Sequence, residues 1–190
     1  MYLVILLILF LVFYPFSYRH FFSPSHPDIF FLFAHSSPSH FFTNFISVFL
    51  LWFISRKLKL NQKRLFIVFF VTSFSSLFLS YLFDLPVIGS SVGIYGMTGF
   101  ILPELSIIVS PAISYTVLFL AILLAPSLIP WGKVFHIFGF SFGVIARYFL
   151  DYRTISYLAA LRSMGYDYYS VRGTAYLPGS YMIEYKREKE

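Results

Sequence analysis

Three groups of polar residues interrupt the long apolar runs of this chain, and each contains side chains that can take part in acyl transfer. The groups are HSSPSHFFTN (residues 35–44), GSSVGIYG (residues 89–96) and HIFGFSFG (residues 136–143). In the first group His40 and Asn44 are four residues apart, and in the second Ser91 and Tyr95 have the same spacing. That spacing places both members of a pair on one face of a helix. His136 begins the third group.

Together these side chains can build a serine hydrolase site. A serine hydroxyl is a poor nucleophile until a base takes its proton, and His136 is the candidate base for Ser91. The tetrahedral oxyanion needs preorganised donors, which the His40 imidazole, the Asn44 amide and the Ser91 backbone N–H can supply. Since no carboxylate lies near the groups to orient His136, we expect the ring of Tyr95 to pack on the imidazole.

The composition indicates an all-α membrane protein. Apolar residues make up 58% of the 190 residues and charged residues 12%, against about 25% charged residues in soluble domains. Lipid must therefore be the solvent for much of the surface. Cysteine is absent, which excludes disulfides and thiolate metal sites. The net charge of +6 does not indicate nucleic acid, because the basic residues lie between apolar runs and at the C-terminal end.

Six hydrophobic spans are predicted, over residues 1–16, 39–55, 65–83, 91–103, 112–129 and 134–150. In the second span, Ser37 and Pro38 are the expected N-cap and first helical position. The fourth span is predicted to stop near Pro103, after about 13 residues or roughly 20 Å of helix. The hydrocarbon core is about 30 Å thick. We therefore expect Ser91 to begin this helix below the outer surface, beside a polar cavity.

The distribution of fixed positive charge predicts the orientation. Basic residues concentrate in the loop at residues 56–64 and after residue 146, whereas the other loops between spans hold only Arg19 and Lys133. The positive-inside rule then places both termini and the 56–64 loop in the cytoplasm. An even number of spans is required for that, and six satisfies it.

The three groups resemble, in order and in span, the motifs of the rhomboid family of intramembrane serine proteases. The family patterns are H-x-x-x-x-H-x-x-x-N, then G-x-S with an aromatic residue four positions later, then H-x-x-G-x-x-x-G. The matching residues are His35, His40 and Asn44, then Gly89, Ser91 and Tyr95, then His136, Gly139 and Gly143. The sequence departs from the family at Val92, where glycine is usual, and at Tyr18-Arg19, where a Trp-Arg pair is common.

The resemblance implies a six-helix rhomboid-like bundle with a short central fourth helix over residues 1–151, followed by a cytoplasmic tail over residues 152–190. It implies an intramembrane serine endopeptidase of the cell membrane, without a cofactor, that cleaves transmembrane protein substrates by a Ser91–His136 dyad. His40 and Asn44 would bind the oxyanion. His35, Gly89, Tyr95 and Gly139 would have supporting roles.

Other interpretations exist for each group. Ser91 alone would suit small-residue packing, and His40 with Asn44 would suit interhelical hydrogen bonding. Zinc is not expected, since no HExxH motif or nearby carboxylate supports it. A rhomboid-like pseudoprotease would bind transmembrane segments without cutting them, although its mark would be loss of the serine or the histidine. A transporter would predict repeated halves, which the sequence lacks. In the tail, RTISYLAALRSMG predicts a membrane-surface helix ending at Gly165.

Overall fold

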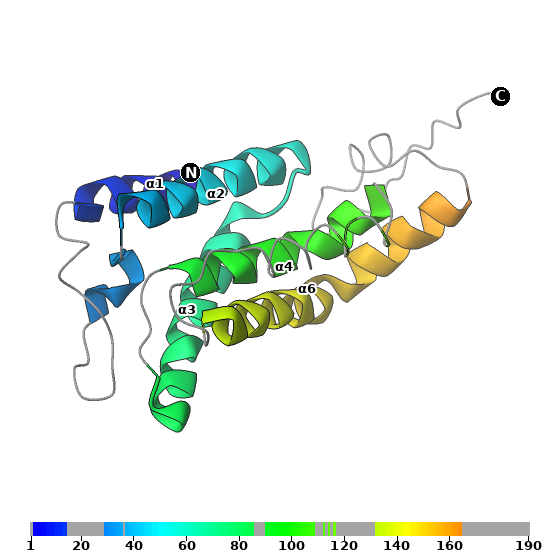
Figure 1. Cartoon of the computed structure of the whole chain (residues 1–190). Coiled ribbons are helices and arrows are strands. Elements are labelled where there is room, and N and C mark those ends of the chain that lie inside the picture. The colour runs from blue at the N-terminus through cyan, green and yellow to red at the C-terminus, as the bar shows by residue number, and fades with distance from the viewer. Residues whose placement is uncertain are drawn as a thin grey trace.

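The described part of the chain is helical throughout. The computed structural model describes residues 2–14, 29–35, 37–85, 90–108, 112, 114, 116 and 132–164. Its elements are α1 (Tyr2–Phe13), the 3₁₀ helix η2 (Ile29–Phe33), α2 (Pro38–Lys57), α3 (Gln62–Phe83), α4 (Ser91–Ile108) and α6 (Gly132–Ser163) (Figure 1). No strand occurs within these ranges. The predicted all-α class is therefore confirmed for them.

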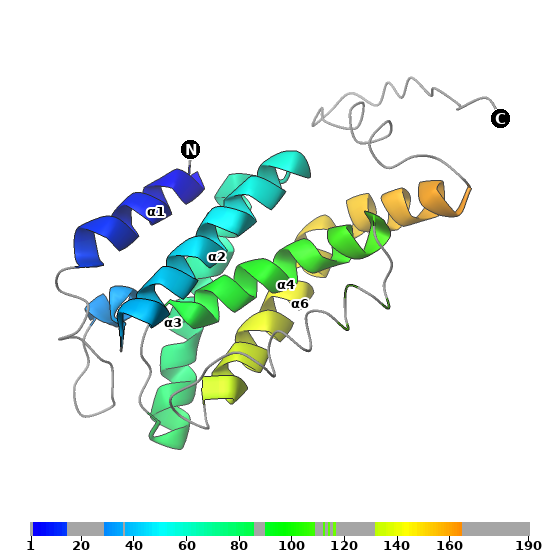
Figure 2. The same cartoon turned by 45° about the horizontal axis from the view of Figure 1, so that its top comes forward.

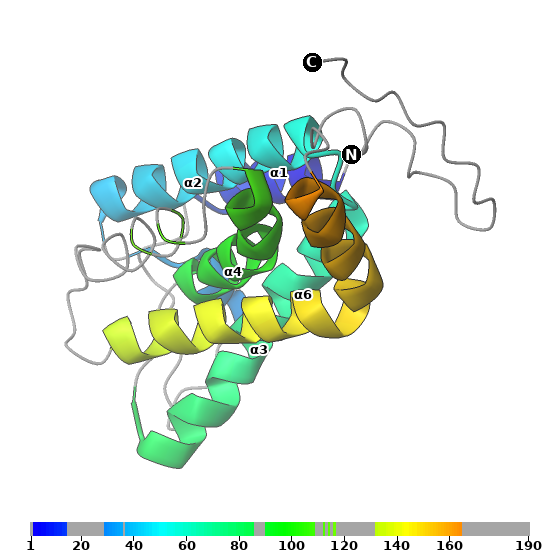
Figure 3. The same ribbon diagram turned by 90° about the vertical axis from the view of Figure 1, so that its right-hand side faces the viewer.

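Helix α4 lies at the centre of the arrangement. It contacts α2, α3 and α6, and the view along the molecule shows these helices around it (Figure 3). Helices α4 and α6 lie side by side and run in the same direction (Figures 1 and 2). Helix α1 packs against α2 and α3. This order brings the start of α4 next to the start of α6.

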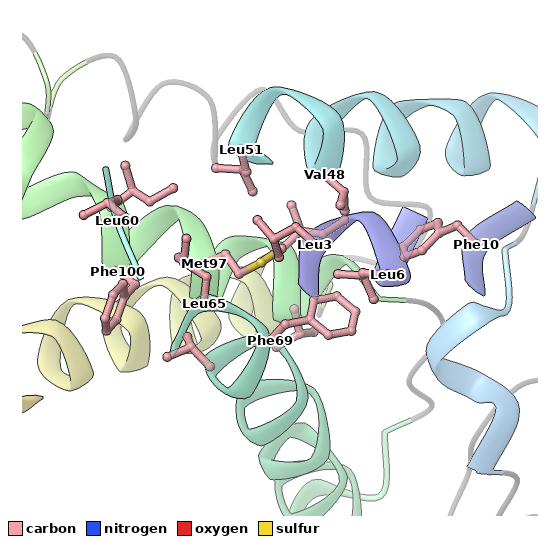
Figure 4. Packing of buried hydrophobic residues seen from close by; sticks show 14 of the residues in the cluster. Leu3, Leu6, Phe10, Val48, Leu51, Leu60, Leu65, Phe69, Met97 and Phe100 are labelled. Carbon is pink, nitrogen blue, oxygen red and sulfur yellow. The ribbon is translucent and has the colours of Figure 1, made fainter. Parts of the chain in front are cut away.

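Apolar side chains fill the space between the helices and also cover the outside. Leu3 of α1, Val48 of α2, Phe69 of α3 and Met97 of α4 belong to one buried cluster (Figure 4). On the outer faces many large apolar residues are exposed, with Phe149 at 88% of its surface. Helices that are apolar on all sides fit a lipid environment.

Three of the described helices are long and apolar enough to cross a membrane. They are residues Pro38–Lys57, Gln62–Phe83 and Gly132–Asp151, and α1 is a shorter apolar helix. These helices fall on the predicted second, third, sixth and first spans. Most of the predicted fifth span, at residues 112–129, lies outside the described residues, as do Tyr18 and Arg19. The number of six spans stays a prediction.

The start of α2 follows the sequence signal. Ser37 is the N-cap and its Oγ accepts a hydrogen bond from the backbone N–H of His40 at 3.2 Å, while Pro38 is the first helical residue. Both assignments were predicted. The hydroxyl satisfies one of the backbone donors that a helix leaves free at its first turn. Because the cap sets the first residue of α2, it also sets the face of the helix on which His40 and Asn44 lie.

The predicted end of the fourth span at Pro103 is wrong. Helix α4 continues through this proline to Ile108 and contains 18 residues, or about 27 Å of helix. Membrane helices tolerate proline where neighbouring helices support the backbone, and Leu102 and Glu104 on either side of Pro103 are buried. The length of α4 therefore does not by itself place Ser91 far below the surface.

The helix expected in the tail is a continuation of α6. At Asp151 the backbone leaves helical geometry (φ −134°, ψ 21°), and a helical segment continues beyond this kink to Ser163. Ile155 in this segment is buried in the core cluster. Gly165 and the rest of the tail lie outside the described residues. The kink falls at the predicted boundary between residues 151 and 152, and the division into two parts stays a prediction.

Candidate active site

Ser91 and His136 meet at the beginning of two parallel helices. Ser91 is the first residue of α4, and His136 lies in the second turn of α6. The Ser91 Oγ is 2.9 Å from the His136 Nε2, a hydrogen-bonding distance, and both residues are buried. With the proton of the neutral imidazole on Nδ1, Nε2 accepts from the serine hydroxyl. This is the geometry that a general base needs to activate a nucleophile.

Glycines allow the two helices to come this close. A Cβ on Gly139 would collide with the backbone oxygen of Val92, and a Cβ on Gly143 would collide with that of Gly96. Small residues let membrane helices pack backbone against backbone. The close approach at Gly139 and Gly143 brings Ser91 within reach of His136.

Tyr95 stacks on His136. The two ring centroids are 4.3 Å apart and the ring planes are inclined by 28°. Tyr95 is one turn beyond Ser91 on α4, so the same helix supplies the hydroxyl and the flat surface that supports the imidazole. The Nδ1 of His136 has no hydrogen-bond partner in the described part of the chain. Ring packing thus holds the imidazole where many serine hydrolases use a carboxylate.

The first turn of α4 supplies backbone donors beside the serine. The first helical hydrogen bond runs from the Ile94 N–H to the Ser90 carbonyl at 3.0 Å. The N–H groups of Ser91 and Val92 precede it and have no acceptor within the helix. The positive end of the helix dipole adds to their attraction for an anion. An oxyanion formed at Ser91 would therefore lie next to these donors.

Val92 and Ser90, on either side of Ser91, are both buried. Val92, which stands where the resemblance leads to glycine, is buried with its carbonyl against Gly139. Gly93 follows it and packs against Ser73 and Phe69 of α3. The valine is thus accommodated without separating α4 from α6. Ser90 is fully buried, and its Oγ has no hydrogen-bond partner among the described residues.

Helix α2 contributes a buried amide and a second imidazole. Asn44 is buried, and its Nδ2 has no hydrogen-bond partner within the described residues. Helix α2 contacts α4. His40 and Asn44 are one turn apart on α2, so their side chains share one face of this helix.

His35 supports the start of α2. Its Nδ1 lies 2.8 Å from the Phe33 carbonyl and donates a hydrogen bond to it. Its ring meets the rings of His40 and Phe41, with centroids 5.2 Å apart in each case. Burial lowers the pKa of His35 to about 4, so this ring is neutral at physiological pH. Gly89, the other predicted supporting residue, lies outside the described residues.

A buried ion pair, which the sequence did not predict, joins the same two helices several turns beyond Ser91 and His136. Arg147 of α6 pairs with Glu104 of α4, and both side chains are buried. Arg147 also pairs with Asp151 at 2.6 Å, and Asp151 pairs with Arg64 at the start of α3. We call these four residues the four-charge network. Opposite charges within two apolar helices were a usable signal, but only the fold shows that they meet.

No group of three or more His, Cys, Asp or Glu residues in the described ranges is arranged to hold a metal ion. The serine hydroxyl, the imidazole beside it and the first-turn donors form a set that suits acyl transfer.

The chain matches a known protein family over most of its length. The family model described as Rhomboid domain matches residues 27–153, which include Ser91, His136, His40 and Asn44. Comparison with curated proteins returns no match, and neither does comparison with solved structures.

Proposed function

The chain belongs to the rhomboid family, and from this premise we propose that it is an intramembrane serine endopeptidase. Its substrates are transmembrane or membrane-adjacent segments of other membrane proteins. The observation that carries the proposal is the 2.9 Å contact between the Ser91 Oγ and the His136 Nε2. Three of the described helices are long and apolar enough to cross a membrane, which supports a membrane location.

The reaction follows from the position of the imidazole. His136 Nε2 takes the proton from the Ser91 hydroxyl as the Oγ attacks the carbonyl carbon of the scissile peptide bond. His136 then gives that proton to the leaving amine as the C–N bond breaks, which leaves an acyl group on Ser91. Water attacks this ester with His136 again acting as base, and the acid product leaves with Ser91 restored.

Stabilisation of the oxyanion is assigned to two sources. The N–H groups at the start of α4 lie beside Ser91, and the Asn44 amide and His40 imidazole come from α2, which contacts α4. Donors that are already in place when negative charge develops lower the barrier without reorganisation. The buried Nδ2 of Asn44, which has no partner in the described part of the chain, is suited to this role.

We also propose a location and an orientation for the enzyme in the membrane. The lipid bilayer surrounds the domain at residues 1–151, and residues 152–190 form a cytoplasmic tail. Both termini are cytoplasmic, as the basic residues of the 56–64 loop and of the tail favour. The partners are transmembrane proteins, with no role for nucleic acid and no cofactor.

Reconstitution into liposomes with a transmembrane reporter tests this function. We expect wild-type protein and Ser90→Ala to cleave the reporter, and Ser91→Ala to leave it intact. Ser90 is the matched control because it is an adjacent buried serine. Binding of the reporter by wild-type protein without cleavage would favour a pseudoprotease. Undiminished cleavage by Ser91→Ala would end the serine-protease proposal.

A further inference from the structure

Polar contacts join α4 to α6 near both ends of their interface. At one end the Ser91 Oγ bonds to the His136 Nε2 at 2.9 Å. About three to four helical turns further along the two helices, Glu104 pairs with Arg147 inside the protein. The two helices run in the same direction (Figure 2). The site and the buried ion pair are thus opposite ends of one helix pair.

Between these two ends, three glycines bring the backbones of the two helices into close contact. Gly99 lies against the Phe140 carbonyl, Gly139 against the Val92 carbonyl and Gly143 against the Gly96 carbonyl. At such points there is no side chain to interlock with the opposite helix and resist sliding. A shift by one residue moves a helix by about 1.5 Å, whereas a hydrogen bond of this kind keeps its strength only over a few tenths of an ångström.

The geometry of the ion pair can fix the position of α4 along α6. One guanidinium nitrogen of Arg147 bonds to Glu104, and another bonds to Asp151 at 2.6 Å. The guanidinium also lies over the Phe100 ring, 5.0 Å from its centroid. Two anions and a ring fix the planar group in direction as well as in position. Asp151 continues the network to Arg64, which ties the kink of α6 to the start of α3.

Energetics favour a positioning role over a stabilising one. Removing two charges from water costs roughly what their mutual attraction returns, so a buried ion pair adds little net stability. Its best-attested use is to specify one arrangement among several of similar energy. The glycine contacts between α4 and α6 provide little side-chain interlocking against sliding of one helix along the other. An ion pair between the two helices can therefore set their register.

We propose that Glu104 and Arg147 are positioning residues that set the register of α4 against α6 and thereby hold Ser91 at hydrogen-bonding distance from His136. The proposal rests on the proposed protease function. It assigns the ion pair no contact with substrate. A misplacement of about 1 Å at a reacting group can cost about 10²-fold in rate.

The test replaces both charges by apolar side chains of similar length, in Glu104→Met/Arg147→Met. We expect the thermal unfolding midpoint to stay at or above the wild-type value, kcat for a transmembrane reporter to fall at least tenfold, and KM to change by less than twofold. Ser106→Ala is the control, since Ser106 is buried in the same turn of α4 and bonds only to the Pro103 carbonyl of its own helix in the described contacts. A fall in kcat that merely follows a fall in the unfolding midpoint would overturn the positioning role.

A second readout does not depend on cleavage. In ¹⁵N-labelled protein the imidazole signals of His136 are assigned by their loss in His136→Ala. The double variant should move them toward the positions that they take in Ser91→Ala, where the serine contact is missing. Unchanged His136 signals would contradict the inference. If wild-type protein fails to cleave any reporter, the proposed function fails, whereas the imidazole signals still decide the register question.

A milder variant covers the case in which the double variant does not fold. Arg147→Lys keeps the positive charge beside Glu104, but an ammonium cannot hold both carboxylates with the planar fork of arginine. We expect kcat and the His136 signals to lie between those of wild type and of Ser91→Ala. Wild-type values for both would overturn the proposal.

Discussion

The imidazole of His136 has an unusual means of support for a catalytic base. In a triad, a carboxylate holds the tautomer of the histidine and stabilises the imidazolium. Here the Tyr95 ring stacks on the imidazole, and the Nδ1 has no hydrogen-bond partner among the described residues. Orientation is therefore supplied by packing, while no charge near Nδ1 in that part of the chain offsets the imidazolium. We expect the catalytic constant to be modest for this reason.

The contribution of Tyr95 should depend on its ring. Tyr95→Phe keeps the surface that lies 4.3 Å from the imidazole, and we expect it to retain most of the wild-type kcat. Tyr95→Ala removes that surface, and we expect at least a tenfold lower kcat because His136 can then turn away from Ser91. Rates of reporter cleavage by the two variants provide the measurement. Equal losses would show that the hydroxyl, and not the ring, is the important part.

The oxyanion donors on α2 provide a second prediction for single residues. We expect Asn44→Ala and His40→Ala each to lower kcat by about 10²–10³, the usual cost of losing one such donor. Thr43→Ala is the control, because Thr43 is exposed on the same helix and its hydroxyl bonds back to the Ser39 carbonyl. Steady-state cleavage rates that differ from wild type by only a few-fold would show that α2 does not serve the oxyanion.

Residue type and spacing were informative where the chemistry is local. Ser91 and Tyr95 share a helix, so a spacing of four residues was enough to predict that they act on one neighbour. The contact between Glu104 and Arg147 joins positions 43 residues apart. From the sequence, Arg147 was one of the positive charges that predict the orientation, and Glu104 had no assigned partner. Only the packing of α4 on α6 shows that they neutralise each other.

At the scale of the elements, α4 and α6 form the part of the molecule on which the site depends. Ser91 and His136 are brought together because glycines let the two backbones touch. Gly139 and Gly143, two of these glycines, are positions of the third motif in the sequence. The sequence did not predict the continuation of α4 past Pro103 or that of α6 past Asp151. Both depend on burial against other helices, which overrides the local preference to end a helix.

Enlarging a glycine in this interface should separate the helices. A Cβ at position 143 would collide with the backbone of Gly96, and such overpacking typically costs about 1–3 kcal/mol. We therefore expect Gly143→Ala to lower the thermal unfolding midpoint in detergent and to reduce reporter cleavage. Ser141→Ala, at an exposed position of the same helix, is the control. An unchanged midpoint with full activity in Gly143→Ala would show that the interface accommodates a methyl group at this position.

At the scale of the whole molecule, the basic loop between α2 and α3 lies close to the kink of α6. The basic residues Arg56 and Lys57 end α2, and Arg64 lies in the first turn of α3. Arg64 pairs with Asp151 near the end of the first segment of α6. The 56–64 loop and the kink of α6 therefore lie on the same side of the bundle. Composition predicted the membrane and the distribution of positive charge predicted the orientation, but neither predicted this contact.

The orientation in the membrane can be measured with reporter fusions. We expect a reporter fused after Asn61 and one fused at the C-terminus both to be cytoplasmic, because positively charged loops are retained on that side. A fusion at Asp84, beyond the end of α3, should be external and serves as the control. An external C-terminus together with a cytoplasmic Asn61 would mean that the predicted number of spans is wrong.

Covalent labelling of Ser91 tests the central claim most directly, since it reports an activated nucleophile without any assumption about the substrate. Purified protein in detergent is treated with a serine-reactive fluorophosphonate, and the modified peptide is identified by mass spectrometry. We expect the label on Ser91, with its rate strongly reduced in His136→Ala and unchanged in Ser90→Ala. A label on another serine, or an equal rate of Ser91 labelling without His136, would contradict the Ser91–His136 dyad.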